Sequence, residues 1–371
     1  MIFFRRNLLI IFFSILITAV SFSQTIPFDS ERWEISARES RVENYLGRQS
    51  LYLKGGKALI KDAEFTDGVI KFDIAFSRER GFMGAVWRVQ DGSNYEEFYL
   101  RPHQSGNPDA NQYTPVFNGL SGWQLYHGEG YGTPVTYDFN QWMPVKIVVS
   151  GKQAEFYIKD METPKFIAHE LKRDIKPGTI GLVASNFAPA YFSNFNYTTM
   201  EQPPVLNSSV KQPQPVAAGT IMHWQISNTL DEAVLENTSS LSTIDRTNLT
   251  WQTLKSEYTG LVNLARVQGI SRGSNTAFAK VIIISETEQV KKLKFGYSDR
   301  IKAYLNEQLL YSGNNNYQSR DYRYLGTIGY FDEIYLPLKQ GKNELWMAVS
   351  ESFGGWGIKA MFEDMNGLQI E

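Results

Sequence analysis

The chain has 371 residues, and its 37 Lys and Arg nearly balance its 39 Asp and Glu. This balance lacks the strongly basic footprint of a nucleic-acid-binding protein, so no nucleic acid partner is expected. The absence of cysteine excludes a disulfide framework, a thiolate metal site and a lipid-modified cysteine.

Residues 1–23 have the three-part order of a secretory signal peptide. Arg5 and Arg6 form a basic region, an apolar run covers 8–20, and Ser21–Ser23 supplies small residues before cleavage at Gln24. The alternative is an N-terminal anchor, but the apolar run is short for a span of about 20 residues. No later stretch is long enough to span a membrane. We expect export to the periplasm, the cell surface or the exterior, and cleavage moves the formal charge from −2 to −4.

Alternating apolar and polar residues are the commonest pattern up to residue 199. Ile70, Phe72 and Ile74 share one face of a period-two segment, and Lys71 and Asp73 share the other. The same pattern predicts strands over 68–76, 82–89, 95–101, 145–149, 154–158, 180–184 and 191–197. Gly, Asn, Asp and Pro separate these segments as turn signals, and no amphipathic helix is predicted. Many short strands with turns between them indicate an antiparallel β-sandwich.

Residues 200–219 carry four prolines among Gln, Asn and Ser. Proline cannot donate to a β-ladder, so this segment is interpreted as an extended linker. We therefore place a first domain at 24–199 and a second at 220–371.

The region after residue 219 is again strand-like. Strands are predicted over 221–226, 260–267, 277–285, 290–297, 300–305, 333–338, 343–350 and 356–363. Asn306-Glu307 is interpreted as a hairpin turn, and a polar loop begins at Asn314. The two halves do not align as a repeat, so the expected fold is all-β, with two different antiparallel β-sandwich (jelly-roll) domains joined by a Pro-rich linker.

Two segments carry resemblances to known families. Residues 28–199 contain Trp33, Leu51–Leu53, Phe65–Asp73, Gly84–Arg88, Asn94–Pro102, Trp142–Ile147 and Gly181–Val183. This order resembles the concanavalin A-like lectin/glucanase superfamily, close to its laminin-G-like and 3-keto-disaccharide-hydrolase-like domains. The second half is similar to galactose-binding-like jelly rolls of glycoside hydrolases, through Ile301–Asn306, Leu338–Leu345 and Gly355–Ile358. These resemblances imply jelly rolls that bind a carbohydrate, in a binding or accessory role.

A catalytic carboxylate pair is weakly supported. The Glu-x-Asp-x-x-Glu pattern expected of family-sixteen glucanases on this fold is absent. Glu96 and Glu97 are adjacent, so they point to opposite faces of a strand. Glu97 and Glu129 remain the acid/base candidates of a glycosidase mechanism.

The segment 101–131 is the strongest candidate for ligand binding, because polar loops with aromatics on a rigid sandwich commonly carry sites. Its planar polar groups and aromatics suit a polyhydroxylated ligand. The candidate ligand-binding residues are Arg101, His103, Gln112, Tyr113, Trp123, Tyr126, His127 and Glu129. The alternative is an ordered surface loop with Trp123 and Tyr126 packed inward. A similar polar and aromatic loop covers 317–324, where a contact between the domains is the favoured interpretation.

Metal and cofactor sites have no clear pattern. The four histidines are scattered, and no Asp-x-Asp-x-Asp-Gly calcium loop is present. A calcium site built from carbonyls and one Asp would leave no sequence pattern. We predict no cofactor, while structural calcium remains open.

Three functions follow as hypotheses. The first is an exported, non-catalytic carbohydrate-binding or accessory protein of a bacterial envelope, with an oligo- or polysaccharide as partner. The second is a glycoside hydrolase or lyase acting on a saccharide. The third is a surface adhesion or protein-interaction module.

Overall fold

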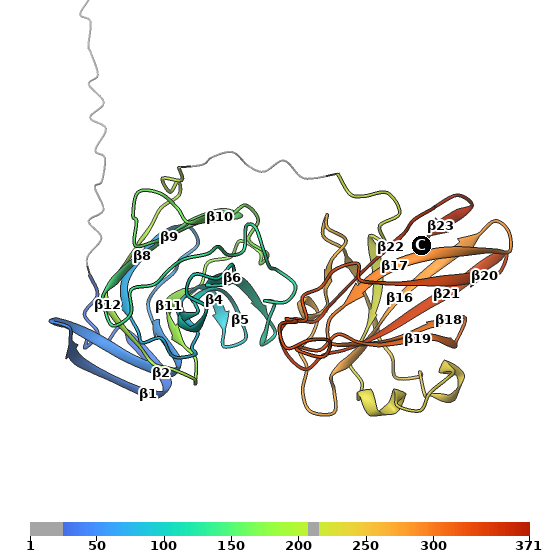
Figure 1. The fold of residues 1–371 in the computed structure, drawn as a ribbon, viewed down its shortest axis with the longest axis horizontal. Coiled ribbons are helices and arrows are strands. Elements are labelled where there is room, and N and C mark those ends of the chain that lie inside the picture. Colours follow the sequence, from blue (N-terminus) through green and yellow to red (C-terminus); the bar gives the residue numbers. More distant parts are fainter. Residues whose placement is uncertain (1–24, 207–214) are drawn as a thin grey trace, which may run out of the picture.

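The computed structural model describes residues 25–206 and 215–371, so the predicted signal peptide and the middle of the predicted linker lie outside the described residues. Within those ranges, strands dominate, and no helix is long and apolar enough to cross a membrane. The helical elements are short 3-10 turns: η1 (Pro102–Gln104), η2 (Glu232–Leu235), η3 (Leu241–Thr243) and η4 (Leu264–Arg266). The predicted fold class is confirmed, with two antiparallel β-sandwiches seen side by side in Figure 1.

The first sandwich is one curled antiparallel sheet. Its strands are β1 (Trp33–Tyr45), β2 (Arg48–Ile60), β3 (Gly68–Ala75), β4 (Met83–Asp91), β5 (Asn94–Leu100), β6 (Asn111–Phe117), β7 (Leu120–Ser121), β8 (Met143–Ser150), β9 (Gln153–Ile158), β10 (Phe166–Ala168), β11 (Thr179–Ala184) and β12 (Ala190–Thr199). The order is β10-β9-β8-β3-β12-β2-β11-β4-β5-β6-β7, and β1 pairs with β2. The long β2 pairs with β12 near Leu51 and with β11 near Ala58, which joins the two layers.

Aromatic side chains fill the space between these layers. Phe72, Trp87, Phe98, Phe156 and Phe192 are all at most 2% exposed. Burying such large apolar side chains is the main favourable contribution to folding. Because side chains alternate along a strand, the residues between these inward positions face the outside of the sheet.

The second sandwich has two sheets. Its strands are β13 (His223–Ser227), β14 (Trp251–Lys255), β15 (Val262–Asn263), β16 (Thr276–Ser285), β17 (Gln289–Tyr297), β18 (Arg300–Leu305), β19 (Gln308–Asn314), β20 (Asp332–Leu338), β21 (Gly341–Ser350), β22 (Gly357–Phe362) and β23 (Leu368–Ile370). One sheet has the order β14-β13-β16-β21-β18-β19 with β23 on β16, and the other β15-β22-β17-β20. Phe295 and Trp356 are fully buried in the core of this sandwich.

Most predicted strands are present, with ends shifted by at most two residues. The Asn306-Glu307 hairpin turn is confirmed, because both residues have positive φ (48° and 72°) between the paired β18 and β19. The strand predicted over 260–267 is wrong. Only Val262–Asn263 is extended, because the Asn263 side chain accepts a hydrogen bond from the Ala265 amide and starts η4.

The two sandwiches meet through the segment that follows β7. Gln124 donates its amide N–H to the Gly354 carbonyl at 2.8 Å, and its carbonyl accepts from Ile328 N at 3.1 Å. Leu125 and Tyr126 pack with Leu261 and Ile328 in a small apolar cluster.

A buried polar network adds to this contact between the sandwiches. Glu257 accepts hydrogen bonds from Tyr126 Oη at 2.6 Å and from Lys172 Nζ at 2.7 Å. Burial of these charged groups is offset by their pairing.

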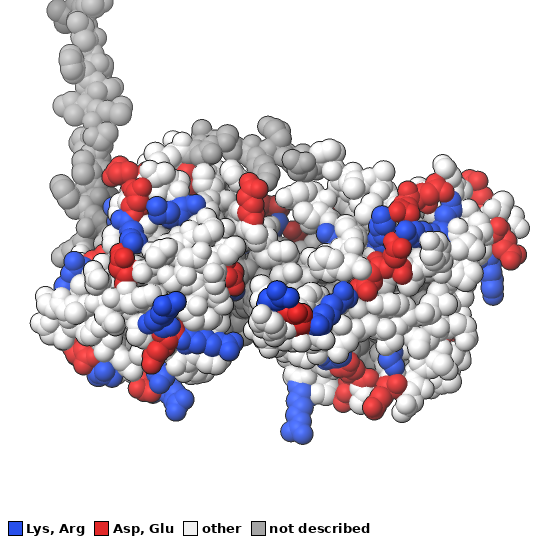
Figure 2. Space-filling model, in the orientation of Figure 1, with Lys and Arg blue, Asp and Glu red and all other residues white. Residues whose placement is uncertain are grey.

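Charged side chains of both signs are intermixed on the face shown in Figure 2, with wide uncharged areas between them. On this face there is no continuous basic stripe. This intermixing agrees with the small net charge of the chain.

Candidate functional site: a cavity between the two sandwiches

A cavity of about 390 Å³ lies between the outer face of β5 and loops of both sandwiches. The first sandwich contributes Arg80, Phe82, Glu97, Tyr99, Arg101, His103, Gln104, Asp109, Ser121, Trp123, Ser185 and Phe187. The second contributes Tyr317, Leu325 and Phe353. Its size falls within the range of about 300–1,000 Å³ typical of small-molecule sites.

The alternation of β5 places Glu97 and Tyr99 in this cavity, and Arg101, directly after the strand, continues the same side. Glu96 and Phe98 point into the core and are fully buried. Glu97, Tyr99 and Arg101 therefore share the opposite face and all three line the cavity. The expectation that Glu96 and Glu97 point to opposite faces agrees with this arrangement.

Arg101 is held rigidly at the cavity wall. Its Nη2 donates to Gln112 Oε1 at 2.6 Å and to Tyr99 Oη at 3.0 Å, and its Nη1 donates to the Asp109 carbonyl at 2.9 Å. The guanidinium carbon lies 5.1 Å from the centre of the Tyr99 ring and 5.9 Å from that of Trp123. The site thus presents a fixed positive charge between aromatic rings.

Gln112 positions this wall from behind. Its Nε2 donates to the carbonyls of Trp123 at 2.9 Å and Tyr126 at 2.5 Å, while its Oε1 accepts from Arg101. The side chain is 5% exposed, so it links β6 to the segment 121–127. Gln112 therefore acts on the cavity through Arg101 and Trp123.

Aromatic rings from both sandwiches meet at the second wall. The ring centres of Trp123 and Tyr317 are 6.3 Å apart, and those of Tyr317 and Phe353 are 5.9 Å apart. Phe353 and Phe187 remain 50% and 61% exposed. These rings offer apolar faces beside the charged groups of β5.

Glu97 and His103, which both line the cavity, are shifted toward their neutral forms. Burial raises the pKa of Glu97 to about 7, against the opposing attraction of Lys57. Burial, Arg80 and Arg101 lower the pKa of His103. His103 Nδ1 is buried and, among the described residues, has no hydrogen-bond partner. Perturbed groups of this kind are typical of functional sites.

The two carboxylates that line the cavity lie far apart along the sheet. Glu97 pairs with Thr114, whereas Asp109 precedes Ala110, whose carbonyl accepts from Arg101 N. Thr114 is four positions after Ala110 in the sequence, so the backbones at these two positions are roughly 13 Å apart. A retaining glycosidase needs carboxyl groups about 5 Å apart, and these two side chains start from backbone positions more than twice as far apart.

The sequence candidates fall into two groups. Glu97, Arg101, His103 and Trp123 line the cavity, whereas the other five do not. Gln112 supports the wall as described. His127 and Glu129 are exposed, and His127 Nε2 lies 3.4 Å from the Ile328 carbonyl.

Tyr113 and Tyr126 have structural partners. Tyr113 is in the core, where its hydroxyl donates to Glu96 Oε2 at 2.7 Å. Tyr126 is 1% exposed between the sandwiches. The segment 101–131 is also less of a loop than expected, because it contains β6 paired along its length with β5.

Phe82, Tyr99 and Phe187 were not among the sequence candidates. Tyr317 and Phe353 come from another sandwich, and their place in this cavity carries no local sequence signal. The contact between sandwiches favoured for 317–324 is present at Tyr317, which lies against Trp123.

Metal ligands are not clustered here. In the described ranges, no group of three or more His, Asp or Glu could hold a metal ion.

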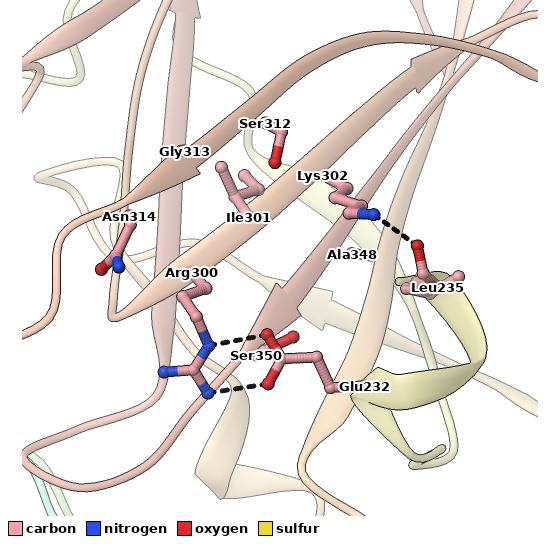
Figure 3. A pocket seen from close by; sticks show the side chains of 10 residues that line it. All are labelled: Glu232, Leu235, Arg300, Ile301, Lys302, Ser312, Gly313, Asn314, Ala348 and Ser350. Carbon is pink, nitrogen blue, oxygen red and sulfur yellow. Dashed lines mark hydrogen bonds and ion pairs between the residues drawn. The ribbon is translucent and has the colours of Figure 1, made fainter. Parts of the chain in front are cut away.

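A second hollow, of about 260 Å³, lies on the second sandwich (Figure 3). Arg300 points to Glu232 with two bonds of 2.6 and 2.8 Å, and Lys302 Nζ donates to the Leu235 carbonyl. Because its charged groups already pair with the protein, we favour the cavity between the sandwiches as the ligand site.

Comparisons with known proteins show a similarity of fold alone. No family model and no curated protein matches the chain. Among solved structures, the chain is similar to the carbohydrate binding module CBM66 from Bacillus subtilis, with 16% identity, 45% of this chain, 96% of that chain and a TM-score of 0.35. It is also similar to a β-glucanase of Bacillus licheniformis, with 13% identity over 49% of this chain and 99% of that chain and a TM-score of 0.36. A galectin-like protein of unknown function from Bacillus subtilis matches with 12% identity over 48% of this chain and 98% of that chain and a TM-score of 0.32. Likeness at this level assigns no activity.

Proposed function

We propose that this protein binds a short saccharide, without cleaving it, in the cavity between the two sandwiches. The observation that carries this proposal is the pairing of aromatic faces with fixed polar groups in one cavity. Trp123, Tyr317 and Phe353 supply rings, and Arg101 and Asp109 supply planar groups beside them. Sugar rings have apolar C–H faces that pack on aromatics and hydroxyls that bond to such polar groups.

Binding rather than hydrolysis is favoured by the spacing of the carboxylates. Glu97 and Asp109 start from backbone positions roughly 13 Å apart along the sheet, whereas a retaining pair brings its carboxyl groups to about 5 Å. Asp109 also faces Arg101, with Oδ2 3.7 Å from Nη1. We place this activity outside the cytoplasm, because residues 1–23 have the order of a secretory signal.

A glycoside hydrolase or lyase is the second candidate, and one observation supports it. Glu97 lies in the cavity with its pKa raised to about 7, which is suited to a general acid or base near neutral pH. Turnover of a saccharide by the wild type that is lost in Glu97→Gln would favour this candidate over simple binding.

The test is a glycan screen followed by calorimetry on the mature chain. We expect Trp123→Ala and Tyr317→Ala each to weaken binding at least about tenfold, equal to about 1.4 kcal/mol. Trp142→Ala and Tyr322→Ala are matched controls, because neither residue lines the cavity and Tyr322 is 76% exposed. Folded wild type that binds no glycan, or equal losses in test and control variants, would refute the proposal.

A further inference from the structure

Arg80 lines the cavity between the sandwiches from the loop that joins β3 to β4. Its side chain is exposed, and its guanidinium carbon lies 4.9 Å from the centre of the Phe187 ring. Among residues 25–206 and 215–371, no carboxylate forms an ion pair with this guanidinium and no oxygen accepts a hydrogen bond from it. Arg80 therefore brings to the cavity a positive charge and hydrogen-bond donors that the protein itself does not use.

The two carboxylates of the cavity each have another base as their electrostatic partner. Asp109 Oδ2 is 3.7 Å from Arg101 Nη1. Burial raises the pKa of Glu97, and the positive charge of Lys57 opposes this shift. When all of these groups are ionised, three bases (Arg80, Arg101 and Lys57) face two acids, which leaves one positive charge without a counterpart. Protonation of Glu97 increases this excess.

His103 does not supply the missing negative charge, but it responds to the charge of Arg80. Burial first, and then Arg80 and Arg101, lower the pKa of His103. Its Nδ1 is buried and has no hydrogen-bond partner in the described part of the chain. A negative group bound to Arg80 would oppose the field of that guanidinium at the imidazole and favour protonation of His103. His103 thus reports whether an anion is bound there.

Aromatic rings flank the unpaired guanidinium. Phe187 is 61% exposed, and its ring centre lies 6.0 Å from that of Phe82, which also lines the cavity. A sugar ring packed on Phe187 would carry its substituents toward Arg80, since the guanidinium lies over the same ring. The parallel N–H donors of an arginine match the two oxygens of a carboxylate.

We propose that the saccharide bound in this cavity carries a carboxylate, as a uronic acid does, and that Arg80 binds this carboxylate. The inference rests on the proposed function, because it names the class of sugar bound at the same site. A neutral sugar leaves the charge of Arg80 without a counterpart, whereas a uronic acid supplies the third acid for the three bases. Complementary charge of this kind selects one partner over another.

The experiment compares acidic sugars with their own neutral forms. The mature chain is titrated by calorimetry with oligogalacturonate, oligomannuronate and oligoglucuronate, and with the methyl ester of each. We expect at least one acid to bind about tenfold or more tightly than its ester, and added salt to weaken this preference. Arg80→Gln should remove the preference. Arg78→Gln is the matched control and should keep it, because Arg78 is an exposed arginine of the same loop that does not line the cavity.

An NMR titration of His103 gives a second measurement. Without any sugar, Arg80→Gln should raise the pKa of His103, because the substitution removes one of the two cations that lower it. In the wild type, the pKa of His103 should be higher with the acidic sugar bound than with its methyl ester bound. An unchanged pKa in both comparisons would contradict the place given to Arg80.

The outcomes separate this inference from the proposed function. Equal affinities for acids and esters, or a preference for acids that survives in Arg80→Gln, would overturn the inference and leave saccharide binding in place. A sulfated galactan that binds more tightly than every uronate, and loses this advantage in Arg80→Gln, would overturn the assignment of a carboxylate. A folded wild type that binds neither acids, nor esters, nor any glycan of the screen would refute both proposals.

Discussion

Replacing Glu97 by Gln should reveal the energetic consequence of a carboxyl placed in the cavity. The pKa of Glu97 in the folded protein is about 7, against about 4.5 in an unfolded chain. The folded state therefore binds this proton more tightly. Its stability contribution is fully present below about pH 4.5 and is lost as the pH rises through about 7.

The magnitude follows from the size of the shift. The folded and unfolded pKa values differ by about 2.5, and each pKa unit corresponds to about 1.4 kcal/mol, so the upper limit is about 3.5 kcal/mol. Solvent in the cavity screens the charge, so we expect about 1–3 kcal/mol. Glu97→Gln removes the ionisation and should gain this amount relative to wild type between pH 4.5 and pH 8.

The assay is chemical denaturation at a series of pH values, with a carbon NMR titration of labelled glutamate. Glu129→Gln is the control for the loss of one carboxyl, because Glu129 is exposed outside the cavity. Parallel stability profiles for wild type and Glu97→Gln across this range would refute the reasoning. So would a glutamate resonance at position 97 that titrates near 4.5.

Two further changes test the contact between the sandwiches and the packing of the first one. Glu257→Gln removes the 2.7 Å partner of the buried Lys172, which keeps Glu170 at 2.8 Å, and should cost about 1–2 kcal/mol in unfolding free energy. Chemical denaturation checks this, and an unchanged unfolding free energy would contradict the role of this network. Gly181→Ala should destabilise the chain by about 3 kcal/mol, because its Cβ would lie 1.9 Å from the Ala58 carbonyl oxygen. Gly92→Ala, with nothing within 4 Å, is its control, and similar melting curves for the two would refute the packing argument.

The alternation of apolar and polar residues was enough to predict most strands, and the Asn306-Glu307 turn was predicted from its residue types between two such segments. It missed the long hairpin of β1 and β2. The β1 sequence carries many charged residues and a half-exposed burial pattern, so no apolar face repeats clearly. Its turn is Leu46-Gly47, with φ of 46° and 76°, and Leu at such a position gives no turn signal.

The sequence predicted only those residues of the candidate site that lie close together in the chain. Arg101, His103 and Trp123 lie on one segment, and their shared cavity agrees with the polar and aromatic pattern there. The sequence left open whether the aromatic rings of that segment bind a ligand or pack inward. Trp123 lines the cavity, whereas Tyr126 packs inward. Tyr317 could not be predicted beside Trp123, since contacts between distant segments depend on how whole sandwiches dock.

Because both sandwiches line the cavity, ligand binding is thermodynamically coupled to the docking of one sandwich on the other. A ligand that contacts both Trp123 and Phe353 binds only when the two sandwiches are docked. The free energy by which the ligand stabilises docking therefore equals the free energy by which docking strengthens ligand binding. At a ligand concentration one hundred times Kd, this amounts to about 2.7 kcal/mol. A sandwich separated from its neighbour would lose this reciprocal gain.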